Sequence, residues 1–321
     1  MRQSIIMKKI ALVFPGQGSQ SIGMLADLAK DFPVVNLMFD AVSDVVGYDV
    51  WALTQTGPKD LLDKTAYTQV AMLTADVAVF KVLEEQGLPS VSMMAGHSLG
   101  EYAALVCARV LSLQDAARLV KKRGNVMQEA VSEGVGAMAA IVGLTDEQVL
   151  AICSRASLID DYVAPANYNA IGQVVIAGHT PAVMRALQCA EEAGARLAKC
   201  IPVSVPCHCS LLKDAAEIFS HALESTTFNQ PIIPVMSNVD LSIYHSSEQI
   251  KTLLKEQLYR PVRWVETIQA MQKDGIELII ECGPGTVLGG LIKRIDRTLT
   301  VRSVNDTVSL NNACEILRSE V

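Results

Sequence analysis

Short apolar runs alternate with helix-like segments along the first part of the chain. Residues 10–14 and 91–95 are apolar runs of strand length, and segments 23–30 and 71–86 have helix-like patterning. The stretch 111–130 predicts a further helix. Strands that alternate with helices are typical of a parallel sheet covered by helices. We therefore expect an α/β fold for this part of the chain.

A second pattern begins near residue 134. One helix is expected after Thr145, which forms a capping box with Gln148, and another at Thr180, with a capping hydroxyl and Pro181 in the first helical position. The strand-like runs around these helices are 137–142, 162–166, 173–177 and 195–201. The resulting order, β-α-β-β-α-β, is the ferredoxin-like pattern.

After residue 204 the first pattern returns, with buried strand-like runs at 234–238 and 278–281. We therefore predict a small ferredoxin-like domain, residues 134–204, inserted into a large α/β domain. The large domain would consist of residues 1–133 and 205–321.

Composition narrows the possible partners. The chain has 321 residues, 50% of them hydrophobic, and a formal net charge of −7. An acidic balance argues against nucleic acid or an anionic membrane as a partner. No apolar run approaches the ~18 residues that suggest a membrane span, and the run 10–14 is shorter than the core of a signal peptide.

The eight cysteines are scattered, and none has Cys-x-x-Cys spacing. Cys207-His208-Cys209 would need a third and fourth ligand at matching spacing, so we expect no metal there. Scattered free thiols are typical of a reducing compartment, which predicts a cytoplasmic protein.

The sequence Gly96-His97-Ser98-Leu99-Gly100 carries the strongest chemical signal. It lies between an apolar run and a helix-prone run, which is the layout of a nucleophile elbow. The flanking glycines allow a tight turn that exposes the serine hydroxyl above a sheet, so we expect a hydrolase-like large domain with Ser98 as nucleophile. The amide of Leu99 would be one donor of an oxyanion hole.

Ser98 needs a base, and the sequence offers several histidines. His97 is adjacent, but neighbours on a tight turn usually point apart. His208 is our leading candidate, because it lies in an apolar segment where the predicted small domain returns the chain to the large one. The alternatives with capping, loop or solvated positions are His179, His221 and His245. A base is placed by the fold, so the choice stays a hypothesis at this point.

Two further features could bind a ligand. The glycines of segment 15–20 free the backbone for close approach, although such a segment is often only a turn and helix start. It lacks the spacing of a dinucleotide fingerprint. Arg123 lies at the buried margin of its helix, whereas Lys122 points away from the apolar stripe. A guanidinium there favours either a ligand carboxylate or phosphate, or a structural ion pair.

Taken together, these motifs resemble those of malonyl-CoA:acyl-carrier-protein transacylases. The resemblance covers nearly the whole chain, and the motifs occur in family order. They are Phe14-Pro15-Gly16-Gln17-Gly18-Ser19-Gln20, residues 96–105 around Ser98, Arg123, segment 205–209, segment 257–264 and Glu281-Cys282-Gly283-Pro284-Gly285. Cys207 departs from the pattern, since relatives more often have serine or phenylalanine beside the histidine.

The resemblance implies a ping-pong transfer of a malonyl group from CoA to the phosphopantetheine thiol of an acyl carrier protein. Ser98 would attack the thioester, with His208 as general base and then acid. The amides of Gln17 and Leu99 would form the oxyanion hole.

The resemblance also assigns supporting roles. Arg123 would bind the malonyl carboxylate, and Gln257 would position His208 through its backbone carbonyl. No metal or cofactor would be needed, the protein would be a monomer, and the pathway would be fatty acid or polyketide synthesis.

Two other functions remain as alternatives. A serine hydrolase of the α/β-hydrolase type would have its histidine late in the chain, whereas the last histidine here is His245. A protein that only docks an acyl carrier partner would not need Ser98, His208 and Arg123 together.

Overall fold

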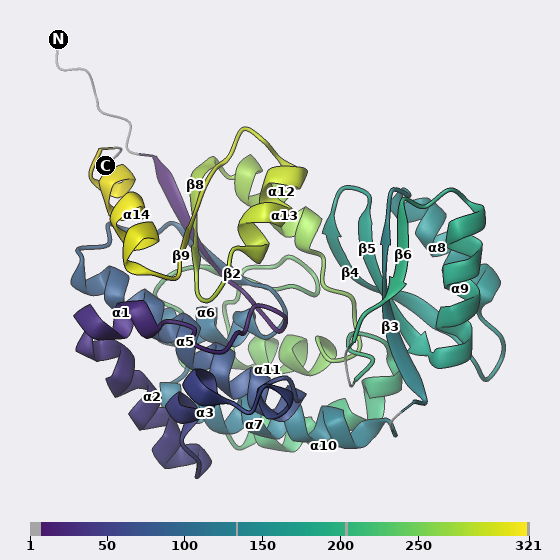
Figure 1. The fold of residues 1–321 in the computed structure, drawn as a ribbon, viewed down its shortest axis with the longest axis horizontal. Coiled ribbons are helices and arrows are strands. Elements are labelled where there is room, and N and C mark those ends of the chain that lie inside the picture. The colour runs from purple at the N-terminus through teal and green to yellow at the C-terminus, as the bar shows by residue number, and fades with distance from the viewer. Residues whose placement is uncertain (1–7, 133, 203–204, 320–321) are drawn as a thin grey trace.

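The computed structural model describes residues 8–132, 134–202 and 205–319. Its larger part is built on a five-stranded parallel sheet with the order β7-β2-β1-β8-β9 (Figure 1). The strands are β1 (Lys9–Phe14), β2 (Met93–Gly96), β7 (Val235–Met236), β8 (Ile276–Cys282) and β9 (Thr300–Val304). The parallel sheet predicted from the early alternation is confirmed. The strand expected at 234–238 is present but only two residues long.

Helices cover both faces of this sheet, as parallel sheets require. Leu12 and Phe14 of β1 face one core, whereas Ala11 and Val13 face the other. The helices are α1 (Ala26–Asp31), α2 (Pro33–Val46), α3 (Val50–Thr56), α4 (Lys59–Leu62), α5 (Thr65–Glu85), α6 (Gly100–Cys107), α7 (Leu113–Ala130), α10 (Lys213–Glu224), α11 (Ser247–Glu256), α12 (Trp264–Lys273), α13 (Val287–Ile295) and α14 (Thr307–Ser319), with a 3₁₀ turn η1 (Ser210–Leu212).

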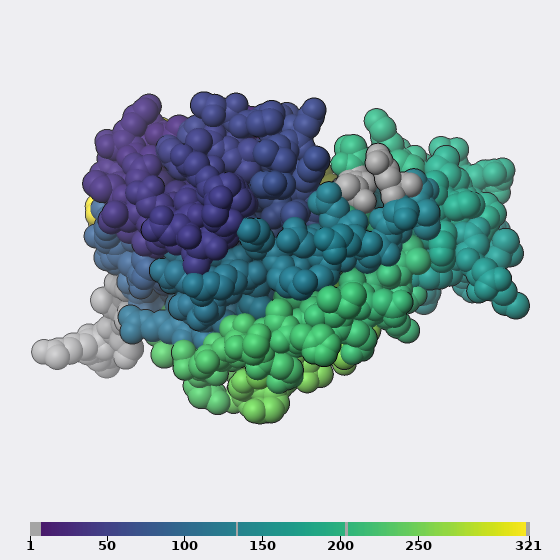
Figure 2. Space-filling model, turned by 90° about the horizontal axis from the view of Figure 1, so that it is seen from below, coloured from purple at the N-terminus to yellow at the C-terminus, as the bar shows by residue number. Residues whose placement is uncertain are grey.

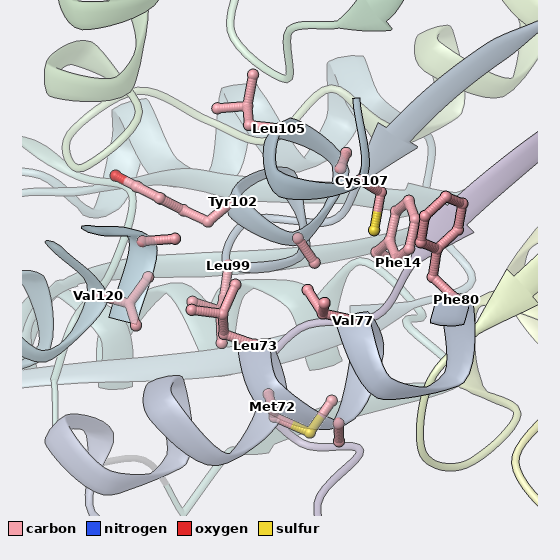
Figure 3. Close-up of a cluster of buried hydrophobic side chains, with 14 of the residues drawn as sticks. Phe14, Met72, Leu73, Val77, Phe80, Leu99, Tyr102, Leu105, Cys107 and Val120 are labelled. Carbon is pink, nitrogen blue, oxygen red and sulfur yellow. The ribbon is translucent and has the colours of Figure 1, made fainter. Parts of the chain in front are cut away.

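Helix α5 is the long helix of the first core. By length and composition alone it could cross a membrane, but 83% of its most apolar window is buried inside the fold. Leu99, just beyond β2, lies among Leu73 and Val77 of α5 and Val120 of α7 (Figure 3). The turn that carries Ser98 is therefore anchored in the main core.

The part of the chain that carries a second sheet projects to one side of the molecule (Figure 2). This sheet is antiparallel, with the order β4-β5-β3-β6. Its elements are β3 (Gly136–Val142), α8 (Asp146–Ala156), β4 (Val163–Ala170), β5 (Gln173–His179), α9 (Thr180–Glu192) and β6 (Leu197–Cys200). This is the β-α-β-β-α-β order that the sequence predicts.

The two faces of the second sheet have different neighbours. Alternate residues of a strand point to opposite faces. Val174 and Ile176 pack against α8 and α9, which lie on the outer side in Figure 1. Val175 and Ala177 instead share a cluster with Met138 and Cys209, on the side of the large sheet.

The two predicted helix starts in this region have different outcomes. The capping box of Thr145 and Gln148 is present at the start of α8. The capping role of Thr180 was wrong, because the N-cap of α9 is His179 and the Thr180 hydroxyl instead donates to the carbonyl oxygen of Gly134. The domain boundaries at 133/134 and 204/205 adjoin residues outside the described ones, and they stay a prediction.

Candidate active site

The carboxyl ends of the parallel strands bring the candidate residues to one edge of the sheet. In open α/β sheets, ligands bind at this edge. Ser98 follows β2, the segment 15–20 follows β1, and Asn238 follows β7. His208 comes from the segment that leaves the second sheet.

Ser98 lies on the tight turn that the glycine spacing predicts. Its φ is 52°, in the left-handed region. The chain passes itself so closely that a Cβ on Gly96 would lie 1.8 Å from the carbonyl carbon of Gly100. A Cβ on Gly100 would lie 2.0 Å from the carbonyl oxygen of Phe14. Both glycines are therefore required by backbone contact, because no flexible side chain could move aside.

This close approach predicts a large loss of stability in Gly100→Ala. The added methyl group would push β1 away from α6, and overpacking of a rigid core costs typically 1–3 kcal/mol or more. Gly290→Ala is the matched control, since its Cβ would meet nothing within 4 Å and the residue is exposed in helix α13. That variant is expected to be more stable by up to about 1 kcal/mol. Urea unfolding of both variants checks the prediction, and equal stabilities would contradict it.

His208 is the histidine that meets Ser98. Its Nε2 lies 2.7 Å from the Ser98 Oγ. Its Nδ1 lies 2.7 Å from the carbonyl oxygen of Gln257. A carbonyl oxygen only accepts, so Nδ1 carries the proton and Nε2 faces the serine as an acceptor. This tautomer can take the proton from Ser98.

The other histidines lie elsewhere. His97 contacts Asn169, with its Nε2 2.7 Å from Asn169 Oδ1. His179 caps α9 and meets the amide of Tyr162 through Nδ1. His221 and His245 are exposed.

Burial controls the protonation of His208. Its side chain is 3% exposed. Desolvation, and next the charge of Arg123, lower the pKa of His208 to about 3. The imidazole is therefore neutral over the whole physiological range.

Arg123 is more deeply buried than its helical position predicts, with no exposed surface. Its Nη1 donates to Gln69 Oε1 at 2.9 Å, and its Nη2 donates to Gln257 Oε1 at 2.9 Å. Nη2 also lies 3.4 Å from the Ser98 Oγ. These three acceptors are all neutral, so within the described chain no structural ion pair occupies the guanidinium.

The segment after β1 lies against the elbow. A Cβ on Gly16 would be 2.5 Å from the carbonyl oxygen of His97 and 3.7 Å from the amide nitrogen of Leu99. Within the described residues the amides of Gln17 and Leu99 have no hydrogen-bond partner. Two amides beside the nucleophile are thus available to an incoming oxygen atom.

Sequence reasoning missed two residues that support the elbow. Asn238 Oδ1 accepts from the Ser98 amide at 2.7 Å, and its Nδ2 donates to the Gly96 carbonyl oxygen at 2.6 Å. Glu101 is fully buried below the turn and accepts from Gln257 Nε2 at 2.6 Å and from the Tyr244 hydroxyl. Burial raises the pKa of Glu101 to about 7, although these hydrogen bonds and Arg123 act in the opposite direction.

A cavity of about 440 Å³ opens above Ser98. This is the size of a small-molecule site. Its walls come from both sheets, with Gln17, His97, Ser98, Cys207 and His208 near the reacting atoms and Met138, Asn167, Asn169 and Val175 from the second sheet. The predicted nucleophile and base therefore share one cavity, which lies between the two sheets.

The part of the chain that the structure describes contains no cluster of side chains that could bind a metal ion. No three His, Cys, Asp or Glu side chains there come close enough together to hold an ion. Cys207 and Cys209 are free thiols, and burial raises the pKa of both.

Comparison with known proteins gives the same assignment as the motifs. The acyl transferase domain family matches residues 11–310. The malonyl CoA-acyl carrier protein transacylase of Escherichia coli (strain K12) is 50% identical over 310 residues, which are 97% of this chain and 100% of the relative.

Solved structures agree with the sequence match. The malonyl CoA-acyl carrier protein transacylase from Coxiella burnetii has a TM-score of 0.96 at 47% identity, over 98% of this chain and 99% of that one. A type II PKS acyl-carrier protein in complex with its malonyl-transacylase gives a TM-score of 0.94 at 51% identity, over 96% of this chain and 99% of that one. With relatives of this identity along almost its whole length, the chain belongs to the acyl transferase family, in the group of malonyl-CoA:acyl-carrier-protein transacylases.

Proposed function

We propose that this protein transfers a malonyl group from malonyl-CoA to the phosphopantetheine thiol of an acyl carrier protein. The observation that carries the proposal is the 2.7 Å contact between Ser98 Oγ and His208 Nε2, with Arg123 Nη2 3.4 Å from the same oxygen. A nucleophile, a base and a cation at one point suit a thioester whose acyl group ends in a carboxylate.

In the first half-reaction, Ser98 Oγ attacks the thioester carbonyl carbon while His208 Nε2 takes the hydroxyl proton. The carbonyl oxygen becomes an oxyanion, which the amides of Gln17 and Leu99 bind. Each such donor is typically worth ~10²–10³ in rate. The intermediate then collapses, the carbon–sulfur bond breaks, and His208 returns the proton to the CoA thiolate. The product is a malonyl ester on Ser98.

In the second half-reaction, the thiol of the carrier protein gives its proton to His208 and attacks the ester carbonyl carbon. The bond to Ser98 Oγ breaks, and His208 returns the proton to the serine. Arg123 binds the malonyl carboxylate with both Nη atoms in place of its neutral partners. The backbone carbonyl oxygen of Gln257 keeps His208 in the same tautomer throughout.

The direct test is a transfer assay with malonyl-CoA and a phosphopantetheine-bearing acyl carrier protein. We expect the malonyl group to appear on the phosphopantetheine thiol of the acyl carrier protein, with little free malonate. Free malonate as the main product would instead identify a thioester hydrolase, and no turnover with carrier binding intact would identify a docking protein.

The displaced pKa of His208 predicts an unusual pH dependence. An ordinary histidine with a pKa near 6.5 would be about 30-fold less available as a base at pH 5 than at pH 7 and above. Since burial lowers the pKa of His208 to about 3, we expect kcat/KM for acetyl-CoA to change by less than ~2-fold over this range. Acetyl-CoA is used because it brings no carboxylate to Arg123.

The control for this profile is the stability of the protein. The unfolded chain binds a proton at His208 as the pH falls below 6.5, whereas the folded protein does so only near 3. Stability is therefore lost progressively as the pH falls through this window, and thermal melting at pH 5 must show folded protein. A fall in activity with a midpoint near pH 6.5 in folded protein would contradict the prediction.

Other features of the proposal come from the sequence. We expect a cytoplasmic monomer that needs no metal or cofactor and binds neither nucleic acid nor membrane. Its pathway is fatty acid or polyketide synthesis. The substrate would bind between the two predicted domains, which are residues 134–204 and residues 1–133 with 205–321.

A further inference from the structure

A chain of three buried groups connects a carboxylate to the guanidinium at the active site. Glu101 Oε2 accepts from Gln257 Nε2 at 2.6 Å, and Gln257 Oε1 accepts from Arg123 Nη2 at 2.9 Å. Glu101 and Arg123 have no exposed surface, and Gln257 is 1% exposed. The negative and positive charges are thus joined through one side-chain amide.

Two acceptors, the Glu101 carboxylate and the Ser98 carbonyl oxygen, fix which way this amide points. Above the pKa of Glu101, about 7, the carboxylate is ionised and only accepts hydrogen bonds, so the NH₂ group of Gln257 must face it. The same NH₂ group donates to the Ser98 carbonyl oxygen at 3.0 Å. The amide oxygen is then left for Arg123. With the amide reversed, Gln257 would present a donor to a guanidinium that has only donors.

The other amide that contacts Arg123 has no such constraint. Gln69 Oε1 accepts from Nη1, but Gln69 Nε2 meets only Met127 Sδ, at 3.5 Å. Sulfur is a weak acceptor, so the orientation of Gln69 is less strongly fixed. Gln257 is therefore the more firmly oriented of the two amides that contact Arg123.

Glu101 is itself fixed from several sides. The Tyr244 hydroxyl donates to Oε1 of Glu101, and the backbone amide of Asn238 donates to Oε2 at 3.4 Å. Asn238 also binds the elbow on both sides of His97, through the Gly96 carbonyl oxygen and the Ser98 amide. The carboxylate thus belongs to the same rigid unit as the nucleophile.

We propose that Glu101 is a positioning residue, which orients the Gln257 amide and so holds Arg123 ready for the carboxylate of the substrate. This inference rests on the proposed function. The position of His208 does not depend on the Gln257 side chain. His208 contacts the backbone carbonyl oxygen of Gln257, which the end of helix α11 fixes. Loss of Glu101 should therefore impair substrates with a carboxylate and spare those without one.

The test compares transfer of malonyl and acetyl groups to the carrier protein by wild type and Glu101→Gln. The glutamine keeps the shape of the side chain but has no charge and one acceptor oxygen in place of two, so only the Ser98 carbonyl oxygen still requires the NH₂ group of Gln257. Loss of a hydrogen bond to a charged group predicts a fall of roughly 10- to 100-fold in kcat/KM for malonyl-CoA. We expect acetyl transfer to fall less than ~3-fold, because only charge-dependent contacts are lost.

Glu281→Gln is the matched control. Glu281 is also a fully buried carboxylate, and its oxygens accept from Ser303 Oγ and from the amides of Leu288 and Gly289, away from the cavity. Its variant is expected to lose stability but to keep the malonyl-to-acetyl ratio of the wild type. A double variant gives a second check. Once Arg123 is alanine, adding Glu101→Gln should change malonyl transfer little, because the two act as one unit.

Equal losses for both substrates in folded Glu101→Gln would overturn the inference. If that variant does not fold, Tyr244→Phe replaces it, since it removes one donor to Glu101 and is expected to lower the ratio by a few-fold. An unchanged ratio there would also overturn the inference. Absence of malonyl transfer in the wild type would be a failure of the proposed function instead.

Discussion

Ser98→Ala is expected to lose malonyl transfer by a factor of roughly 10⁶ in kcat, the size of effect seen when the serine of a serine–histidine pair is removed. The alanine leaves His208 and the amides of Gln17 and Leu99 in place, but no atom remains that can carry the acyl group. Because both half-reactions pass through the ester, both are expected to stop. Steady-state transfer to the carrier protein measures the loss.

The control for this variant is its fold. Ser98 already occupies the left-handed region at φ 52°, and alanine has a similar cost there, so the melting temperature is expected to stay close to that of wild type. Residual transfer within ~100-fold of wild type, from a folded and pure variant, would show that another group is the nucleophile.

Arg123→Ala is expected to reduce kcat/KM for malonyl-CoA by roughly 10²–10³, because removal of one partner of a buried charge pair costs typically 2–5 kcal/mol. Acetyl transfer is expected to change much less, since an acetyl group has no carboxylate for the guanidinium. The measurement is the ratio of the two kcat/KM values, for wild type and variant.

Lys122→Ala is the matched control on the same helix. Lys122 is exposed, whereas Arg123 has no exposed surface. The control variant is expected to keep both rates. If Arg123→Ala lowers malonyl and acetyl transfer equally, the guanidinium has a structural role only, and the substrate carboxylate must bind elsewhere.

Local features of the chain made most of the fold predictable. Strand and helix alternation predicted the parallel sheet, and the glycine spacing around Ser98 predicted the tight turn. Both depend on residues close together in sequence, where steric limits act directly. The helical pattern likewise separated Arg123 from Lys122, although it underestimated how deeply the guanidinium is buried.

Contacts between distant segments were not predictable from the residues alone. The backbone amide of Asn238 contacts Glu101, which is 137 residues earlier in the sequence. The Tyr244 hydroxyl contacts the same carboxylate over a separation of 143 residues. No spacing rule connects such residues, and only the packing of β2 against β7 brings them together. His208 and Ser98 are also far apart in sequence, so the residues alone left His208 as the leading candidate among several histidines. Its contact with Gln257 was expected only from the family resemblance.

The most direct test of Ser98 as the nucleophile is to locate the acyl group on the protein. Wild type is incubated with malonyl-CoA alone, quenched in acid, digested and mapped by mass spectrometry. We predict one malonyl group, on the peptide and side chain of Ser98. A malonyl group on the neighbouring thiol of Cys207, which lines the same cavity, or no covalent adduct while transfer proceeds, would contradict this prediction.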